Sequence, residues 1–339
     1  MNILIIGGTR FMGPHIVRGL SAVGHHVTVF HRGESQADLP PEVERIHGDR
    51  DQLDAYADPL RATQPDVVLD MIIRNRQQAQ TLMDLFRGVA RRIVLISSAD
   101  VYRAYNRLRG VSPGPPDPWP LDEEAPLRDK PYPYRDYAQR DDDPMYSYDK
   151  IPAEQVVLSD PELSGTVLRL PMVFGPQDRQ HRLYSIAKRM ADQRPAIILS
   201  EEQAAWIAPR GYVEDMAHAI HLAVRDERAA GRVYNVALAE QPTEREWITR
   251  IGRVMGWDGR IIALPEAELP EALQSTLNYS QRWSLDSRRL RAELGYTERV
   301  DLDSALTRTV EWELAHPPGE SYGDAFDYGT EDRIIQAFE

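Results

Sequence analysis

The sequence predicts an α/β protein with a doubly wound parallel sheet, followed by a smaller C-terminal α/β domain. The chain opens with an apolar run at residues 3–6, breaks at glycines and resumes as a helical pattern. Short apolar runs then alternate with amphipathic segments, which is typical of a parallel sheet with right-handed crossover helices. With 339 residues, the chain is long enough for one large domain or two smaller ones.

Each element of the first half follows from its own pattern. The run at 3–6 has no polar alternation, so we expect a strand that is buried on both faces. The next segment repeats apolar residues at helical spacing, from Ile16 to Val23. Beyond it we expect strands at 27–30, 43–46, 66–71, 92–97 and 166–170, and helices at 53–60, 77–89 and 146–158. Pro152 is expected to kink the first turns of the last of these helices.

The alternation of strands and helices becomes less regular after Pro176. We expect helices at 183–193, 215–224, 244–255 and 302–313, and short strands at 196–199, 232–236 and 261–264. The chain is therefore divided into a first domain at 1–175 and a smaller second domain at 176–339. Segments near 210–237 are expected to return to the first domain.

Two segments fall outside the alternation. Residues 103–145 are rich in proline and carry aromatic side chains, and a loop of this length is usually functional or disordered. The aromatic residues favour a lid or a substrate-facing wall. The stretch after Pro318 is acidic and aromatic, and the sequence leaves open whether it is an arm on a partner subunit or a frayed tail.

Composition excludes several classes of function. The chain has no cysteine, so it has no disulfide, zinc–thiolate site or cysteine nucleophile. The first apolar run lacks a basic flank and is too short to span a bilayer, so a cytoplasmic location is expected. The net charge of −13 disfavours binding to nucleic acid or to an anionic membrane. We therefore expect a small-molecule partner, and a homodimer is left open.

The glycine-bearing turn between the first strand and helix carries the first functional signal. Its sequence is Gly-Gly-Thr-Arg-Phe-Met-Gly, from Gly7 to Gly13. Such a turn brings backbone N–H groups and a helix N-terminus close to a pyrophosphate. The strand, turn and helix start predict a Rossmann-type, dinucleotide-binding first domain, with the second domain mainly binding substrate. The glycine spacing is not the standard one, and the alternative is a glycine turn without a ligand. Arg10 stands where a middle glycine is usual.

A tyrosine and a lysine four residues apart carry the second signal. On a helix, Tyr146 and Lys150 would share one face, and the ammonium would lower the pKa of the phenol. Such a phenol can exchange a proton with a hydroxyl or carbonyl group. Ser98, at the end of the fifth strand, could hydrogen-bond the same oxygen. The alternatives are a surface Tyr–Lys pair and a serine that caps a turn, and Tyr148 would point elsewhere.

The chain resembles the extended short-chain dehydrogenase/reductase family, which contains nucleotide-sugar epimerases and dehydratases. The likeness covers nearly all of the sequence, and its motifs occur in the family's order. They are the glycine turn, Asp49, Ser97-Ser98 with Val101-Tyr102, Tyr146 with Lys150, Leu168-Arg169-Leu170-Pro171 with Phe174-Gly175-Pro176, Gly211 to Ala217, Val233 to Val236, and Asp286 with Leu290 and Glu293-Leu294-Gly295.

The resemblance implies a role for each matching residue. Tyr146 would be the general acid/base, Lys150 its pKa partner and a ribose ligand, and Ser98 the group that orients the substrate oxygen. The implied cofactor-binding residues are Gly7, Thr9, Arg10, Phe11, Met12, Gly13, His31, Arg32, Asp49, Arg50 and Lys150. Residues expected near the substrate are Asp100, Met172 and Arg210.

Departures from the family pattern reduce the number of reactions that the resemblance implies. Dehydratases of the family carry Asp-Glu after the serine or threonine, where this chain has Ala99 and Asp100. Dehydration at a 4,6 position is therefore disfavoured. Met172 stands where nucleotide-sugar enzymes usually have asparagine, and Arg210 could still meet a phosphate. A nucleoside-diphosphate sugar is an open alternative that the motifs do not favour.

The end of the second strand bears on the choice of cofactor. NAD-binding domains usually have a carboxylate there, for the ribose 2′-hydroxyl. This chain has His31 and Arg32, and Arg32 together with Arg10 could pair with a 2′-phosphate. The sequence therefore favours NADP over NAD. The alternative is that both residues lie in a solvated turn.

The sequence as a whole predicts an NAD(P)-dependent reductase or epimerase that transfers a hydride at a secondary hydroxyl or ketone of a sugar-like or other polar small molecule. The alternative from another class is a non-catalytic NAD(P)-binding regulator or RNA-associated protein, because a plastid branch of the family shares the Gly-Gly-Thr-Arg-Phe opening. His218 and His221 are one helical turn apart, but no third ligand is near in sequence, so no metal is expected.

Overall fold

A computed structural model describes residues 1–35, 37–319, 322 and 326–338. Its centre is a seven-stranded parallel sheet in the order β10-β6-β5-β4-β1-β2-β3. The strands are β1 (Asn2–Ile6), β2 (His26–His31), β3 (Glu44–His47), β4 (Val67–Asp70), β5 (Arg92–Ser98), β6 (Ser164–Leu170) and β10 (Val233–Asn235). The order reverses between β1 and β4, which is where doubly wound sheets bind ligands. The predicted fold class is confirmed.

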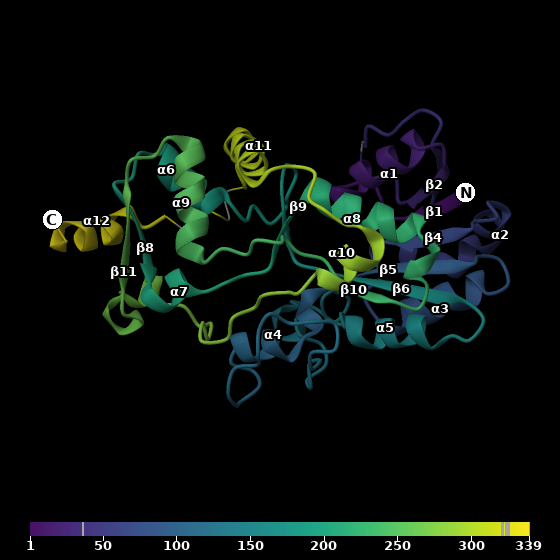
Figure 1. The fold of residues 1–339 in the computed structure, drawn as a ribbon, viewed down its shortest axis with the longest axis horizontal. Helices are drawn as coiled ribbons and strands as arrows, with labels where there is room; N and C mark the ends of the chain where they lie inside the picture. The colour runs from purple at the N-terminus through teal and green to yellow at the C-terminus, as the bar shows by residue number, and fades with distance from the viewer. Residues whose placement is uncertain (36, 320–321, 323–325, 339) are drawn as a thin grey trace.

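Helices cover both faces of this sheet (Figure 1). One face is covered by α1 (Met12–Ala22) and α8 (Val213–Arg225), and the other by α3 (Arg76–Phe86) and α5 (Lys150–Ser159). Alternate residues of β1 supply the two cores, with Ile3 and Ile5 on one side and Leu4 and Ile6 on the other. Burial on both faces explains why the strand reads as an unbroken apolar run. A 3₁₀ segment (Arg50–Tyr56) and α2 (Ala57–Ala62) connect β3 to β4.

The second half of the chain forms a smaller α/β unit at the opposite end of the molecule, so the two termini lie far apart (Figure 1). It contains α6 (Tyr184–Ala191), α7 (Glu201–Ala205), α9 (Glu244–Met255) and α11 (Leu302–Ala315), and a two-stranded sheet of β8 (Ala196–Ser200) with β11 (Arg260–Leu264). A short pair of β7 (Met172–Phe174) and β9 (Arg210–Tyr212) lies between the two units. The helix α10 (Arg288–Leu294) packs beside β10.

The acidic, aromatic C-terminal stretch packs on its own chain. Residues 328–337 form α12 (Tyr328–Ala337), in which Ile335 is buried. Glu331 forms ion pairs with Arg189 at 2.7 Å and with Arg194 at 3.6 Å. Over these residues the stretch is therefore a packed helix and not a frayed tail, and the arm on a partner subunit stays an open alternative.

The proline-rich insert is an ordered part of the first unit. It begins with α4 (Arg103–Leu108), and the buried Asp117 accepts hydrogen bonds from Arg103 and Arg107. Further along, Arg128 pairs with Asp149 at 3.0 Å, and both side chains are buried. The first contacts lie within the insert, and the Arg128–Asp149 pair ties it to the N-terminus of α5. Among the described residues, none of the helices combines the length and apolar character needed to cross a membrane.

Candidate active site

The glycine turn has the backbone geometry that its sequence predicts. Gly7 and Gly8 adopt φ values of 98° and 83°, a region that favours glycine. A Cβ atom on Gly13 would lie 2.3 Å from the carbonyl carbon of Gly8. The absence of that atom lets the start of α1 approach the turn closely. The turn therefore fits the backbone cradle that a dinucleotide pyrophosphate requires.

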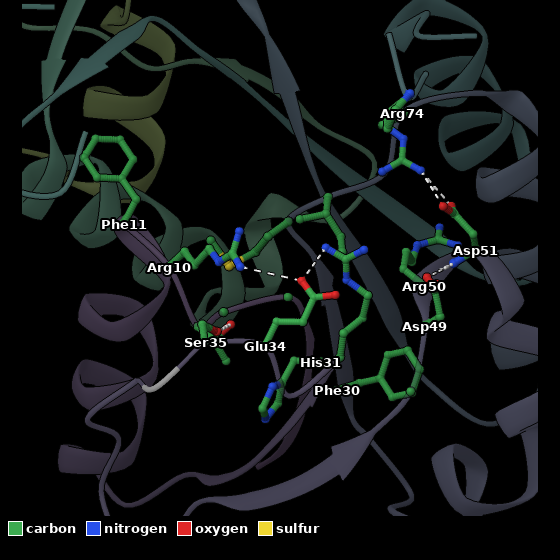
Figure 2. A pocket seen from close by; sticks show the side chains of 18 of the residues that line it. Arg10, Phe11, Phe30, His31, Glu34, Ser35, Asp49, Arg50, Asp51 and Arg74 are labelled. Atoms are coloured by element: carbon green, nitrogen blue, oxygen red, sulfur yellow. Dashed lines mark hydrogen bonds and ion pairs between the residues drawn. The ribbon is translucent and has the colours of Figure 1, made fainter. Parts of the chain in front are cut away.

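A cleft of about 380 Å³ opens at the carboxyl ends of β1 to β4 (Figure 2). Every residue that was predicted to bind cofactor lines it, except Gly13 and Lys150. Gly13 lies behind the turn, against Gly8. The remaining lining residues, which the prediction missed, are Gly8, Phe30, Glu34, Ser35, Gly48, Asp51, Met71, Ile72, Arg74 and Pro144. The cleft lies at the switch point of the sheet and fits an elongated dinucleotide there.

Two arginines meet one carboxylate in this cleft. Arg10 and Arg32 point their guanidinium groups at Glu34, with N–O distances of 3.7 and 3.0 Å; Figure 2 shows the Arg10 contact. All three side chains are about half exposed. Glu34 lies three residues beyond His31, the strand-end position where a carboxylate is usual, so the nearest acid in the sequence does line the cleft.

On the opposite wall of the cleft, two arginines are bound to aspartates. Arg50, predicted to bind cofactor, is buried and donates from Nε to Asp70 at 2.9 Å. Asp49 accepts a hydrogen bond from the backbone of Asp51 and so caps the 3₁₀ segment. Arg74 donates two hydrogen bonds to Asp51, of 2.7 and 2.8 Å (Figure 2). Arg74 was not among the residues predicted to bind cofactor, although its place after β4 puts it at the ligand-binding edge.

Polar side chains gather at the carboxyl end of β5, beside the cleft. The hydroxyl of Ser98 accepts a hydrogen bond from the backbone of Asp100. The carboxylate of Asp100 is buried, and its Oδ2 accepts hydrogen bonds of 2.9 Å from both Tyr134 and Tyr148. Burial, and then the Asp100 charge, raise the pKa of the Tyr148 phenol well above its usual value. Tyr134 comes from the insert, so the insert covers this cluster.

Lys150 connects the cluster with the wall of the cofactor cleft. Its ammonium donates to the carbonyl oxygens of Ile73 at 2.5 Å and Ile96 at 2.8 Å. Burial lowers the pKa of Lys150 to about 8, while the charges of Asp100 and Asp70 act in the opposite direction.

The structure corrects the expected placement of Tyr146. The helix α5 begins at Lys150, with Asp149 as its N-cap, so Tyr146 lies in the preceding turn. Pro152 explains the boundary, because in a helix from residue 146 its ring would clash with an earlier carbonyl group. In α5 it falls in the first turn, where a backbone N–H has no helical partner, so no kink is needed. Tyr146 and Lys150 therefore do not share one helix face.

The residues expected near the substrate lie in two places. Asp100 belongs to the cluster at the end of β5. Met172 and Arg210 are partners in the register of β7 with β9, between the two units. Arg210 is buried, pairs with Glu244 and stacks 4.4 Å from the ring centre of Trp247. Its charge is therefore already balanced by a carboxylate.

The two histidines of α8 lie in different surroundings. The ring of His221 contacts the carbonyl oxygen of Ile16 at 2.8 Å, and a Cβ on Gly19 would lie 1.9 Å from this ring. His221 thus fixes the close packing of α8 on α1. Burial lowers the pKa of His218 to about 4, so its ring is neutral at physiological pH.

Comparison with known proteins places this chain among NAD-dependent enzymes of one family. The model of the NAD dependent epimerase/dehydratase family matches residues 3–237. The 2′-dehydrokanamycin reductase of Streptomyces kanamyceticus is 25% identical over 84% of this chain and 75% of its own length. The chloroplast stem-loop binding protein of 41 kDa b of Arabidopsis thaliana is 24% identical over 70% of this chain and 58% of its own.

A solved structure shows the shared fold. The dTDP-glucose 4,6-dehydratase from Bacillus anthracis, solved in complex with NAD, superimposes with a TM-score of 0.68 at 18% identity. The alignment covers 93% of this chain and 97% of that one. The second unit is part of the match, so both halves of the chain follow one known architecture.

Proposed function

The chain belongs to the NAD dependent epimerase/dehydratase family, and on that basis we propose that it is an NADP-dependent reductase of a sugar-like ketone. The contact of Lys150 with Ile73 carries the proposal. Ile73 follows Ile72 in the wall of the cofactor cleft, and Lys150 also lies beside the cluster at the end of β5. A cofactor in the cleft and a carbonyl group at the cluster would then be neighbours.

The residues around this junction suit hydride transfer. When bound, the cofactor supplies the hydride. Ser98 offers a hydroxyl group to the carbonyl oxygen, and a phenol of the cluster supplies a proton to it. Tyr134 and the other side chains of the insert exclude water, which strengthens these polar interactions. The extended short-chain dehydrogenase/reductase assignment made from the motifs is confirmed by the family match.

The preference for NADP is proposed from the two arginines at Glu34. Guanidinium groups bind phosphate through paired hydrogen bonds, and Arg10 and Arg32 already converge on one anionic group. A 2′-phosphate could replace that carboxylate. Titrating NADPH and NADH against the wild type and the Arg10→Gln/Arg32→Gln variant tests this. NADPH affinity should fall far more than NADH affinity, and equal losses would refute the preference.

A substrate without a diphosphate is proposed from the charges of the second unit. Arg210 is paired with Glu244, Arg182 with Asp178 at 2.8 Å, and Arg194 with Glu331. These cations are therefore already neutralised by acids. The substrate of the Streptomyces relative, as its name states, is 2′-dehydrokanamycin. We propose that this chain likewise reduces a keto group on a sugar-like molecule, and Ala99 disfavours 4,6-dehydration.

Consumption of the reduced cofactor tests the proposed function. NADPH absorbance is followed with a panel of sugar-like ketones that includes 2′-dehydrokanamycin. Ketone-dependent oxidation is expected, and the purified protein should release its cofactor freely on gel filtration. Cofactor that stays bound while a sugar epimer forms without net oxidation would instead show the epimerase. The cytoplasmic location and the homodimer stay predictions from the sequence.

One relative favours a second candidate, an RNA-associated protein without turnover. The Arabidopsis protein is named for binding a stem-loop, and the match covers 70% of this chain. The net charge of −13 opposes RNA binding, because phosphate contacts need clustered cations. A filter-binding titration with a stem-loop RNA at several salt concentrations distinguishes the two. Tight, salt-sensitive binding without ketone reduction would support the second candidate.

A further inference from the structure

We propose that Tyr148, rather than Tyr146, gives the proton to the substrate oxygen, and that Asp100 positions it. This assignment rests on the proposed function. It names a catalytic residue two positions from the tyrosine that the family motif indicates.

Three groups place the Tyr148 phenol at the reaction centre. Its hydroxyl donates to Asp100 Oδ2 at 2.9 Å, and the side chain is 9% exposed. An interaction with the Ser98 side chain lowers the pKa of the same phenol, against the larger effects of burial and of the Asp100 charge. The Nζ atom of Lys150 lies 5.8 Å from the Tyr148 ring centre. Tyr148 thus meets both residues that the family motif associates with the catalytic tyrosine.

Tyr146 is held in a different environment. The guanidinium of Arg135 lies 4.6 Å from its ring centre, and Arg135 Nε donates to its backbone carbonyl at 3.1 Å. Arg135 also stacks on Tyr132, at 3.6 Å from the ring centre. The Tyr146 ring therefore packs with the insert.

A rotation of Tyr146 into the cluster is opposed by the start of α5. Extending the helix back to residue 146 would place Pro152 in its interior, where its ring would clash with an earlier carbonyl group. It would also remove the Asp149 cap, whose side chain accepts a hydrogen bond from the backbone of Ile151. Asp149 is further tied to Arg128 at 3.0 Å. The boundary that excludes Tyr146 from the helix is therefore fixed by several contacts.

The carboxylate of Asp100 can hold the phenol without taking part in the chemistry. It is 3% exposed, and Oδ2 accepts from both Tyr134 and Tyr148. Among the described residues, its Oδ1 is buried and has no hydrogen-bond partner. The Asp100 charge also helps keep Tyr148 protonated, the form that a ketone reduction needs.

The proton balance follows from this arrangement. In the reduction by NADPH, two electrons and one hydrogen nucleus reach the carbonyl carbon as hydride. The O–H bond of Tyr148 breaks and a new O–H bond forms on the substrate oxygen, which gives the alcohol. The resulting phenolate lies near the Lys150 ammonium and recovers its proton from water after the product leaves.

Two matched variants, Tyr148→Phe and Tyr146→Phe, test the assignment in the full-length protein. Each removes one phenol oxygen, and the readouts are ketone-dependent NADPH oxidation and NADPH affinity. Loss of a general acid typically lowers kcat about 100- to 10,000-fold. We expect that loss for Tyr148→Phe, with NADPH affinity unchanged, and near-wild-type turnover for Tyr146→Phe. The reverse pattern would overturn the proposal.

Asp100→Asn tests the positioning role separately, and also decides the case if Tyr148→Phe does not fold. The loss of charge should lower the pKa of Tyr148, so the alkaline limb of the kcat profile should move to lower pH. An unchanged profile would contradict the role of Asp100 and of Tyr148. If the wild type reduces no ketone, the proposed function fails; if the wild type is active and Tyr148→Phe equally so, only this assignment fails.

Discussion

Arg32 lies against Glu34, with 3.0 Å between Nη2 and Oε2, in the cleft that the glycine turn forms. The pair explains how a guanidinium could be held ready for a phosphate before any cofactor arrives. It also places a carboxylate where a 2′-phosphate would come, so the two anions would compete for the same arginines. Under the proposed preference for NADP, removal of the Glu34 charge should therefore strengthen the binding of NADPH and not that of NADH.

Glu34→Gln should raise the affinity for NADPH. Exposed ion pairs of this kind contribute up to about 1 kcal/mol, which corresponds to an increase of up to about five-fold. NADH affinity should stay the same or fall, because NADH brings no phosphate to the arginines. The measurement is calorimetric titration, with Glu271→Gln as a control of equal charge outside the cleft. Weaker NADPH binding by Glu34→Gln would contradict the competition.

Gly13→Ala should disturb the turn and the start of α1. Its Cβ would lie 2.3 Å from the Gly8 carbonyl carbon, so the backbone must move. Overpacking of this kind typically lowers the free energy of unfolding by about 1–3 kcal/mol. Urea unfolding measures this loss of stability, and NADPH binding should weaken as well. Gly319→Ala is the control, because nothing lies within 4 Å of its Cβ; equal effects of both changes would count against the close approach.

Much of the architecture was predictable because burial on both faces leaves a clear signal. The apolar runs of β1, β2 and β5 and the helical repeat of α8 and α9 gave the order of elements, and the seven-stranded parallel sheet confirmed the fold class. The three-residue strands β7 and β9 were missed, since they pair with each other outside the main sheet. Only tertiary contact defines them.

The site was less predictable, because spacing along the chain does not fix side-chain direction. The Tyr146–Lys150 spacing indicated one helix face, but Asp149 and Pro152 start the helix at Lys150. The sequence analysis interpreted Pro152 as a kink. Interpreting it as a helix boundary would have moved the predicted start of the helix toward Lys150. The role of Tyr134 needs a contact over 34 positions, to Asp100, that no local pattern reveals.

Burial of Lys150 should make stability depend on pH. Its pKa is lowered to about 8 in the folded protein, below its usual value of 10.5. Between these values the unfolded chain binds more protons, so this group's contribution to stability rises with pH. Below about pH 8 its charge opposes folding in full. Urea unfolding of wild type and Lys150→Met is measured from pH 7 to 10. The free energy of unfolding of the wild type should rise relative to that of the variant. Curves that stay parallel would contradict the burial effect.

The most direct test of the account is to follow the hydride itself. NADPH with deuterium at the transferred position is incubated with the wild-type protein and the ketone panel, and the products are analysed by mass spectrometry. An NADP-dependent reductase should give an alcohol that carries one deuterium for each NADPH oxidised, at a rate above that with deuterated NADH. Alcohol without deuterium, or no alcohol from any ketone while NADPH binds, would contradict the central claim.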